Sequence, residues 1–241
     1  MNSMTQIKYA MVLSIFHKNI QKVLSGLLKN GRPKTVERAI CELVEEKQKI
    51  QFIQVGASDC GLNDPLREYV LKDRAKGLII EPIKQSLCRA QEQYRGISGL
   101  YFANCAIDYA KGSRQIYKIK DVDGLPKWAY QVCSFSRDVL LKHEKEIPQI
   151  RELVVEESVC TESIGELMKQ SGFYSPDLLL IDTEGYDADI LKMFPFEKHC
   201  PDLVVFEHKH LDEKKQREAL ENLKRLKYGV CMLECDVVAK I

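Results

Sequence analysis

The sequence predicts an α/β fold in which an open, doubly wound and mostly parallel β-sheet carries helices on both faces. Two observations predict this fold. From Lys49 onward, short apolar runs alternate with segments of helical periodicity. The runs LIIEP, LLLID and LVVFE are apolar throughout, which is typical of parallel strands covered on both sides. Such sheets bind ligands at the carboxyl ends of their strands, so the residues that follow each strand are the first candidates for function.

Composition excludes several other classes of protein. The chain of 241 residues is 45% hydrophobic and 29% charged, values that are ordinary for a globular domain and argue against a disordered chain. Its 13 glycines and 8 prolines are too few for a collagen-like or low-complexity protein. The formal net charge is +1, so the overall charge gives no reason to expect a nucleic-acid partner.

Residues 1–48 are predicted to form an N-terminal helical extension, and residues 49–241 form the main domain. Apolar residues recur at helical spacing over 5–29, and Pro33 and Thr35 begin a second helix. The first helix is basic, because no Asp or Glu precedes Glu37. A basic amphipathic helix can lie on an anionic membrane surface, but such helices pack more often on protein. We therefore expect packing on the body or a homo-oligomer, with peripheral membrane contact as the less favoured alternative.

The first half of the main domain is predicted to alternate between strand and helix. Residues 50–55 form a short apolar strand, and a helix follows over 66–71. The second buried strand covers 77–81 and leads into a helix over 85–94. The third strand covers 100–107. Strands separated by helices in this way imply right-handed crossovers.

The second half of the main domain contains an insertion and further strands. Strands are predicted at 113–119, 153–159, 177–181, 203–206 and 228–233, with 237–241 as a short antiparallel partner of the last one. An insertion with helical stretches covers 126–146, Thr161 is predicted to cap a helix, another helix ends at Phe194, and a charged amphipathic helix covers 212–226.

Nine cysteines are scattered through the chain. Their number is odd and no two form a C-x-x-C pair, which argues against a structural zinc site. Most lie in apolar patterns, so we expect buried, reduced thiols and a cytoplasmic protein.

Glycines and polar residues follow the first three predicted strands. Gly56 and Gly61 allow a tight turn in which the backbone approaches a ligand closely. Glu81 lies about twenty residues after these glycines, where a carboxylate can accept the ribose hydroxyls of an adenosine. Asn104 is placed to border an adenine ring. The glycine spacing matches neither the G-x-G-x-x-G of nicotinamide enzymes nor a P-loop.

Acids and histidines follow the later strands. Asp182 and Glu184 lie at a strand-to-helix turn, where two carboxylates are hard to explain by packing. Glu207 is followed by His208 and His210. Two histidines beside acids at the ligand edge of a sheet indicate a general base or a substrate contact, and favour a metal site less.

Five stretches of the chain carry a resemblance to a known family. They are FIQVGASDCGLNDPL, GLIIEP, ANCAID, DLLLIDTEGYDADIL and PDLVVFEHKHL. Together they resemble the FkbM family of methyltransferases that use S-adenosyl-L-methionine (SAM). The stretch SFSRDVLLKH in the insertion is similar to one branch of the family, and IDTEGYDADIL is the most specific part. The resemblance extends from about Gln51 to the C-terminus.

The resemblance implies a class I methyltransferase (Rossmann-like) fold and methyl transfer to a hydroxyl oxygen of a sugar or natural product. It also implies roles for individual residues: Gly56, Ala57 and Asp59 line the methionine part of SAM, Glu81 holds the ribose, Asn104 and Ala106 border the adenine, and Asp182 lies near the amino group or the reacting centre. Many members have Asp where this chain has Gln54, so Asp59 or Asp182 is expected to supply the missing acid.

Methyl transfer from a sulfonium needs an aligned acceptor oxygen and a group that removes its proton, and requires no metal. His208 or His210 is the expected base, with Glu207 orienting it. We therefore predict a SAM-dependent O-methyltransferase that acts on a small-molecule or carbohydrate acceptor, without nucleic acid or a bound metal. Two alternatives stay open: a Rossmann-type protein that binds a nucleotide or nucleotide-sugar, and an inactive interaction module.

Overall fold

The computed structural model describes residues 33–61 and 63–241, and the chain divides into the units Met1–Pro33 and Lys34–Ile241. The helix predicted over 5–29 lies outside the described residues, so its role in a homo-oligomer stays a prediction. Helix α2 (Val36–Lys47) belongs to the second unit and buries Ile40 and Leu43 there. The boundary predicted after residue 48 therefore differs from the division between the units.

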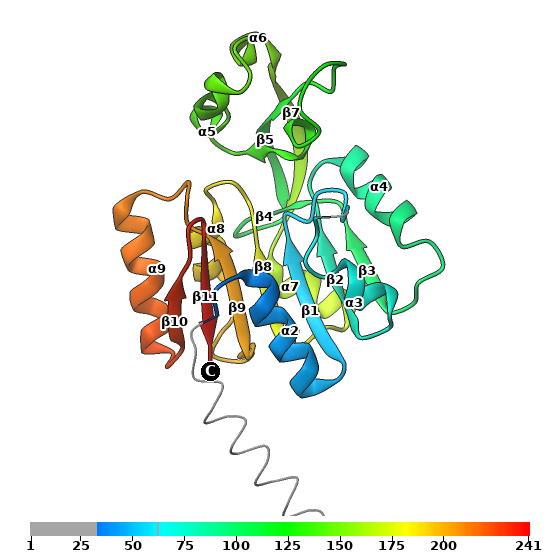
Figure 1. Cartoon of the computed structure of the whole chain (residues 1–241), viewed down its shortest axis with the longest axis vertical. Helices are drawn as coiled ribbons and strands as arrows, with labels where there is room; N and C mark the ends of the chain where they lie inside the picture. The colour runs from blue at the N-terminus through cyan, green and yellow to red at the C-terminus, as the bar shows by residue number, and fades with distance from the viewer. Residues whose placement is uncertain (1–32, 62) are drawn as a thin grey trace, which may run out of the picture. The chain divides into compact units, whose positions relative to one another are not determined.

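The predicted doubly wound sheet is confirmed (Figure 1). In the described part of the chain it has seven strands in the order β10-β11-β9-β8-β1-β2-β3. They are β1 (Ile50–Val55), β2 (Ala75–Ile80), β3 (Leu100–Ala103), β8 (Leu178–Ile181), β9 (Leu203–Glu207), β10 (Gly229–Met232) and β11 (Asp236–Lys240). The pairs among β3, β2, β1, β8 and β9 are parallel. Strand β11 runs antiparallel to β9 and β10, which makes the sheet mostly parallel.

Helices cover both faces of this sheet because both faces of its strands are apolar. In β1, Ile53 and Val55 face a core shared with helices α7 (Ile164–Ser171), α8 (Asp187–Met193) and α9 (Glu213–Arg225). Ile50 and Phe52 face the opposite core, which contains α2, α3 (Arg67–Leu71) and α4 (Lys84–Gln93). Successive side chains of a strand point to opposite faces, so a continuous apolar run fills two cores.

A second, smaller sheet has the order β4-β7-β5-β6. Its strands are β4 (Ala106–Ile107), β5 (Gly112–Ile119), β6 (Cys133–Ser134) and β7 (Val154–Glu162). The short helices of the insertion accompany it: η1 (Ala129–Gln131), α5 (Arg137–Leu141), η2 (Lys142–Lys145) and α6 (Ile150–Leu153). Ile119, Leu140 and Ile150 contribute to a separate hydrophobic core for this part.

Two strand predictions were wrong about where a strand belongs. The segment 100–107 is not one strand, because the chain turns after β3 and enters the smaller sheet as β4. At this turn the Asn104 side chain donates hydrogen bonds to the carbonyl oxygens of Glu81 and Pro82. The strand predicted over 153–159 is β7, which pairs with β5 in antiparallel orientation and lies outside the main sheet.

The predicted helix cap at Thr161 was also wrong. Thr161 is still part of β7, and its hydroxyl donates to the carbonyl oxygen of Ala110. Ser163 caps α7 instead, accepting the backbone N–H of Glu166. Strand β7 continues one residue past Thr161, to Glu162, before the backbone N–H groups of a helix need a cap.

Of the nine cysteines, only Cys60 and Cys105 are buried. The expectation that most are buried is therefore wrong, because Cys88, Cys160 and Cys200 lie on exposed surface. Within residues 33–61 and 63–241, no helix has the length and apolar character needed to cross a membrane.

Candidate active site

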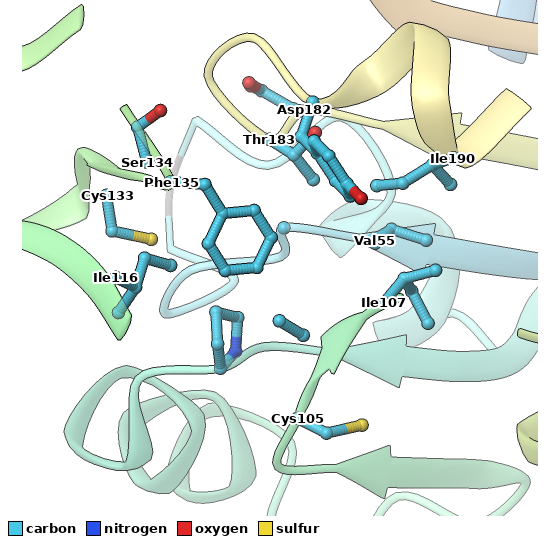
Figure 2. Close-up of a pocket in the computed structure, with 14 residues that line it drawn as sticks. Val55, Cys105, Ile107, Ile116, Cys133, Ser134, Phe135, Asp182, Thr183 and Ile190 are labelled. Atoms are coloured by element: carbon cyan, nitrogen blue, oxygen red, sulfur yellow. The ribbon is translucent and has the colours of Figure 1, made fainter. Parts of the chain in front are cut away.

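A cavity with about 400 Å³ of empty space lies where the main sheet meets the smaller sheet (Figure 2). It is largely apolar, with the Asp182 side chain among its few polar groups. Its lining comprises Val55, Gly56, Pro82, Cys105, Ala106, Ile107, Ile116, Cys133, Ser134, Phe135, Asp182, Thr183, Tyr186 and Ile190. The cavity lies at the carboxyl ends of β1, β2 and β8, as predicted for a sheet of this type.

Gly56, Ala106 and Asp182 are the predicted cofactor residues that line this cavity. Gly56 has a φ of +78°, and an added Cβ would lie 1.7 Å from the carbonyl oxygen of Asp182. The backbone of β1 and the turn after β8 thus touch directly at this point. Only glycine permits both the left-handed conformation and the close approach.

The loop after β1 is held by side chains from two directions. Gln54 is buried and donates a hydrogen bond of 2.7 Å to Asp64. Asp59 accepts hydrogen bonds from the hydroxyl of Tyr130 and the amide of Gln131, which come from η1 in the insertion. Asp64 therefore places a carboxylate beside Gln54, where the sequence comparison with the family found an acid missing.

Glu81 directly precedes Pro82 of the cavity lining and fixes the loop after β1. Its side chain accepts the backbone N–H of Ser58 at 2.9 Å and that of Ile83 at 2.8 Å. Glu81 is 2% exposed, and burial raises the pKa of its carboxyl group to about 7. The buried Ser58 hydroxyl makes no hydrogen bond to any described residue, although it lies in this loop.

The wall opposite β1 comes from residues that the sequence analysis did not assign. Phe135 and Tyr186 meet edge to face, with ring centroids 5.0 Å apart. The Arg114 guanidinium lies 3.8 Å from the centroid of the Phe135 ring, and pairs with Asp108 at 3.1 Å. Phe135 belongs to the SFSRDVLLKH stretch, so the family resemblance of that stretch is the signal that could have indicated this wall.

The turn between β8 and α8 is organised by Asp187. Its fully buried carboxylate accepts the Thr183 hydroxyl at 3.0 Å and the backbone N–H of Gly185 at 3.2 Å. The turn contains Glu184 at a φ of +51°, which is unfavourable for a residue with a side chain. The Ser134 hydroxyl donates to the Glu184 carbonyl oxygen at 2.7 Å and helps to fix this conformation.

Asp187→Ala is expected to lower the free energy of unfolding by about 1–3 kcal/mol, because it leaves buried donors of the turn without an acceptor. Urea denaturation measures the change. Asp189→Ala is the matched control, since the Asp189 side chain is 20% exposed and pairs with the more exposed Lys215 instead of with backbone donors of the turn. Equal stability losses in the two variants would contradict the role of Asp187.

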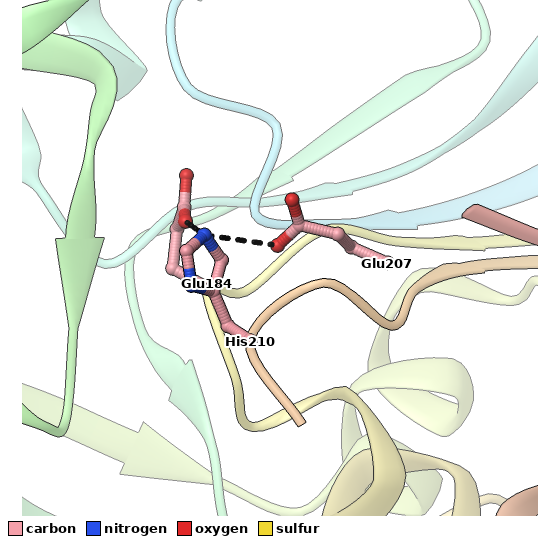
Figure 3. A group of neighbouring side chains, drawn as sticks. All are labelled: Glu184, Glu207 and His210. Carbon is pink, nitrogen blue, oxygen red and sulfur yellow. Dashed lines mark ion pairs between the residues drawn. The ribbon is translucent and has the colours of Figure 1, made fainter. Parts of the chain in front are cut away.

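Glu184, Glu207 and His210 converge beside the cavity and form what we call the carboxylate–histidine group (Figure 3). The His210 Nε2 atom lies 3.1 Å from a carboxylate oxygen of Glu184 and 3.9 Å from one of Glu207. The His210 side chain is only 2% exposed. Glu184 directly follows Thr183 of the cavity lining, although the three residues of the group are not themselves part of that lining.

His208 lies apart from this group. Its Nδ1 atom is 2.8 Å from the amide nitrogen of Gln216, and its Nε2 atom is 3.1 Å from the carbonyl oxygen of Leu233. Both ring nitrogens are thus engaged in hydrogen bonds that hold the loop after β9. Of the two predicted histidines, the structure brings His210 alone to the acids.

The environment of Glu207 is strongly negative. Burial, together with the nearby carboxylates of Glu184 and Asp182, raises the pKa of Glu207 to about 9. Lys209 opposes this effect but does not cancel it. Burial and the two neighbouring carboxylates thus favour the protonated form of Glu207, and the positive charge of Lys209 is too small to offset them.

The fold is a Rossmann-like α/β domain whose cavity lies at the carboxyl ends of the strands. The family model described as the methyltransferase FkbM domain matches residues 54–230. The match covers well over half of the chain, so the chain belongs to the FkbM methyltransferase family, and the resemblance inferred from the sequence is confirmed.

Solved methyltransferase structures also match the chain. The FkbM methyltransferase from Methylobacillus flagellatus KT is 13% identical over 80% of this chain, with a TM-score of 0.49, and the chain spans 44% of its length. The precorrin-6y C5,15-methyltransferase from Geobacter metallireducens GS-15 is 10% identical, with a TM-score of 0.40 and coverage of 88% and 93% of the two chains. A comparison with curated proteins gave no match. The family assignment rests on the family model.

Proposed function

We propose that the protein is a SAM-dependent O-methyltransferase that acts on a hydroxyl group of a sugar or natural product. Membership of the FkbM family supports methyl transfer. The observation that carries the proposal is that the turn between β8 and α8 supplies residues both to the cavity lining and to the carboxylate–histidine group. Asp182 and Thr183 line the cavity, and Glu184 follows them in the same turn. A cofactor in the cavity and a hydroxyl at the group would therefore lie side by side.

The residues around the cavity fit SAM. Gly56 lines the cavity, and its missing side chain lets the backbone of β1 pack directly on the turn that carries Asp182. The Ser58 hydroxyl is buried without a partner among the described residues and can bind a polar group of a ligand. Each Glu81 oxygen accepts one hydrogen bond and has a second lone pair for a ribose hydroxyl. Asp182 supplies an acid for the amino group.

When bound, SAM supplies a methyl group on a positively charged sulfur. The chain must hold the acceptor oxygen in line with that group and take up its proton. The aromatic wall of Phe135 and Tyr186 limits the free space of the cavity and excludes water. We propose that the carboxylate–histidine group receives the hydroxyl proton, with His210 at its centre.

Titration calorimetry of the full chain with SAM, NAD and a set of nucleotide-sugars tests this proposal against the nucleotide-binding alternative. SAM binding, followed by transfer of its methyl group to hydroxyl compounds in mass spectrometry, would support the proposal. Binding of NAD or a nucleotide-sugar in preference to SAM would overturn it. The cytoplasm is the proposed location, supported by the buried, reduced thiols of Cys60 and Cys105.

The affinity for the adenosine part of SAM is expected to rise about tenfold between pH 6 and pH 8. The ribose hydroxyls donate to ionised Glu81, and only about a tenth of a carboxyl group with a pKa of about 7 is ionised at pH 6. Methylthioadenosine is the suitable probe, because it carries the ribose but not the amino group that also titrates. Glu81→Gln should remove the pH dependence, and an unchanged pH profile in this variant would contradict the assignment.

A further inference from the structure

We infer that the carboxylate–histidine group binds a divalent transition-metal ion such as Mn²⁺ or Zn²⁺, with Glu184, Glu207 and His210 as its ligands. This inference goes beyond the proposed function, because binding of the ion requires neither SAM nor methyl transfer. The sequence analysis assigned no metal site, since the three ligands come from two separate loops of the chain.

The first argument is that the three atoms facing one another have no other partner. The Glu184 Oε2, Glu207 Oε2 and His210 Nε2 atoms are buried, and none makes a hydrogen bond within the described residues. Figure 3 shows the two carboxylates on either side of the imidazole. Apart from the ion pairs that His210 forms with the two carboxylates, these atoms have no partner among the described residues. Buried polar atoms are almost always hydrogen-bonded, so their convergence indicates a missing ligand.

The second argument is geometric. All three atoms lie within 4.8 Å of one another. With metal–ligand bonds of about 2.1 Å, neighbouring ligand atoms lie about 3.0–3.4 Å apart. The separation of 3.1 Å between His210 and Glu184 already meets this condition. The separation of 3.9 Å between His210 and Glu207 requires a small rotation of a flexible glutamate side chain.

The third argument is the choice of metal. One imidazole with two carboxylates suits Mn²⁺ and Zn²⁺, whereas Mg²⁺ and Ca²⁺ prefer oxygen ligands alone. Three protein ligands leave at least one open position, which is typical of catalytic metal sites. An acceptor hydroxyl at that position would have its pKa lowered by the ion and lose its proton to solvent water. His210 would then serve as a ligand instead of a base.

The positive charge of Lys142 is expected to weaken binding of a metal ion at His210, so this residue provides a control. The Lys142 ammonium lies 3.4 Å from the Nδ1 atom of His210. Coordination through Nε2 places the ring proton on Nδ1, so the exposed Lys142 side chain must move away. Removing its charge in Lys142→Met should therefore strengthen metal binding.

The test is a titration of the full chain with Mn²⁺ after treatment with a chelator, followed by electron paramagnetic resonance and calorimetry. Mn²⁺ is the suitable probe because it avoids the nine thiols, which prefer softer metals. We expect one ion per chain in the wild type. We expect at least about tenfold weaker binding in His210→Ala and in Glu207→Gln. We also expect unchanged binding in His208→Ala and tighter binding in Lys142→Met.

The metal proposal is overturned if the wild type binds no Mn²⁺ and no Zn²⁺, or if His210→Ala binds them as tightly as His208→Ala does. SAM affinity is measured on the same samples with and without the ion. A second outcome is that no metal binds but SAM binds more weakly to Glu207→Gln than to the wild type. The carboxylates would then balance the positive charge of the SAM sulfonium. In that case the metal proposal fails and the proposed function stands. If a metal binds and SAM does not, the proposed function fails alone.

Discussion

His210→Ala is expected to slow methyl transfer by about 10²–10⁴-fold, the usual contribution of a positioned proton acceptor. The loss is expected whether the imidazole takes the proton itself or holds an ion that lowers the pKa of the hydroxyl. His210 lies at the centre of the carboxylate–histidine group, 3.1 Å from Glu184. SAM affinity should change little, because His210 is not among the residues that line the cavity. Single-turnover rates with saturating SAM measure the effect.

His208→Ala is the matched control for this experiment. His208 lies two residues away, but its ring nitrogens contact Gln216 and Leu233 instead of the acids. The variant should lose some stability and keep nearly the full rate. If both variants turn over at the wild-type rate, proton removal does not involve this loop. Asp182 would then be the next residue to substitute.

Gly56→Ala is expected to abolish SAM binding and to lower the free energy of unfolding by at least about 2 kcal/mol. The sequence alone suggests a steric block of the ligand, with the fold left intact. The structure gives a different reason, because the added Cβ would collide with the protein backbone at Asp182, 1.7 Å away. The turn after β8 must therefore move, and the cavity changes shape with it.

Gly165→Ala is the control for Gly56→Ala. Gly165 lies in helix α7, and an added Cβ there meets no other atom within 4 Å. Alanine favours a helix more than glycine does, so this variant should gain about 0.5–1 kcal/mol. Calorimetry with SAM and urea denaturation on both variants separate the two cases. Normal SAM binding by Gly56→Ala would show that the cavity at β1 is not the cofactor site.

The sequence predicted the main sheet well because its strands are long apolar runs between helical segments. The bounds of β1 were predicted at 50–55, as observed. The smaller sheet was missed because β4 has only two residues and continues the apolar run of β3. The antiparallel pairing of β5 with β7 joins residues far apart along the chain, and hydrophobic periodicity carries no information about such pairing.

The candidate site was predicted in part, because its acids lie at the ends of strands that the sequence located correctly. Glu184 and Glu207 follow the neighbouring parallel strands β8 and β9, whose carboxyl ends meet at one edge of the sheet. If β9 continued, strand alternation would place the side chains of His208 and His210 on the same side. Strand β9 instead ends at Glu207, and the chain turns there, because the Leu211 N–H donates a hydrogen bond to the His208 carbonyl oxygen. Side-chain alternation applies only within the strand, so the sequence could not show that His210 contacts the acids and His208 does not.

The smaller sheet has a consequence for how this enzyme family can diversify. The insertion carries a hydrophobic core of its own, with Leu140 and Ile150 fully buried in it. It also contributes Ile116, Cys133 and Phe135 to the wall of the cavity. Mutations in this wall can accumulate without disturbing the two cores of the main sheet. Substitutions in this wall are therefore expected to change what the cavity binds while the main sheet stays folded.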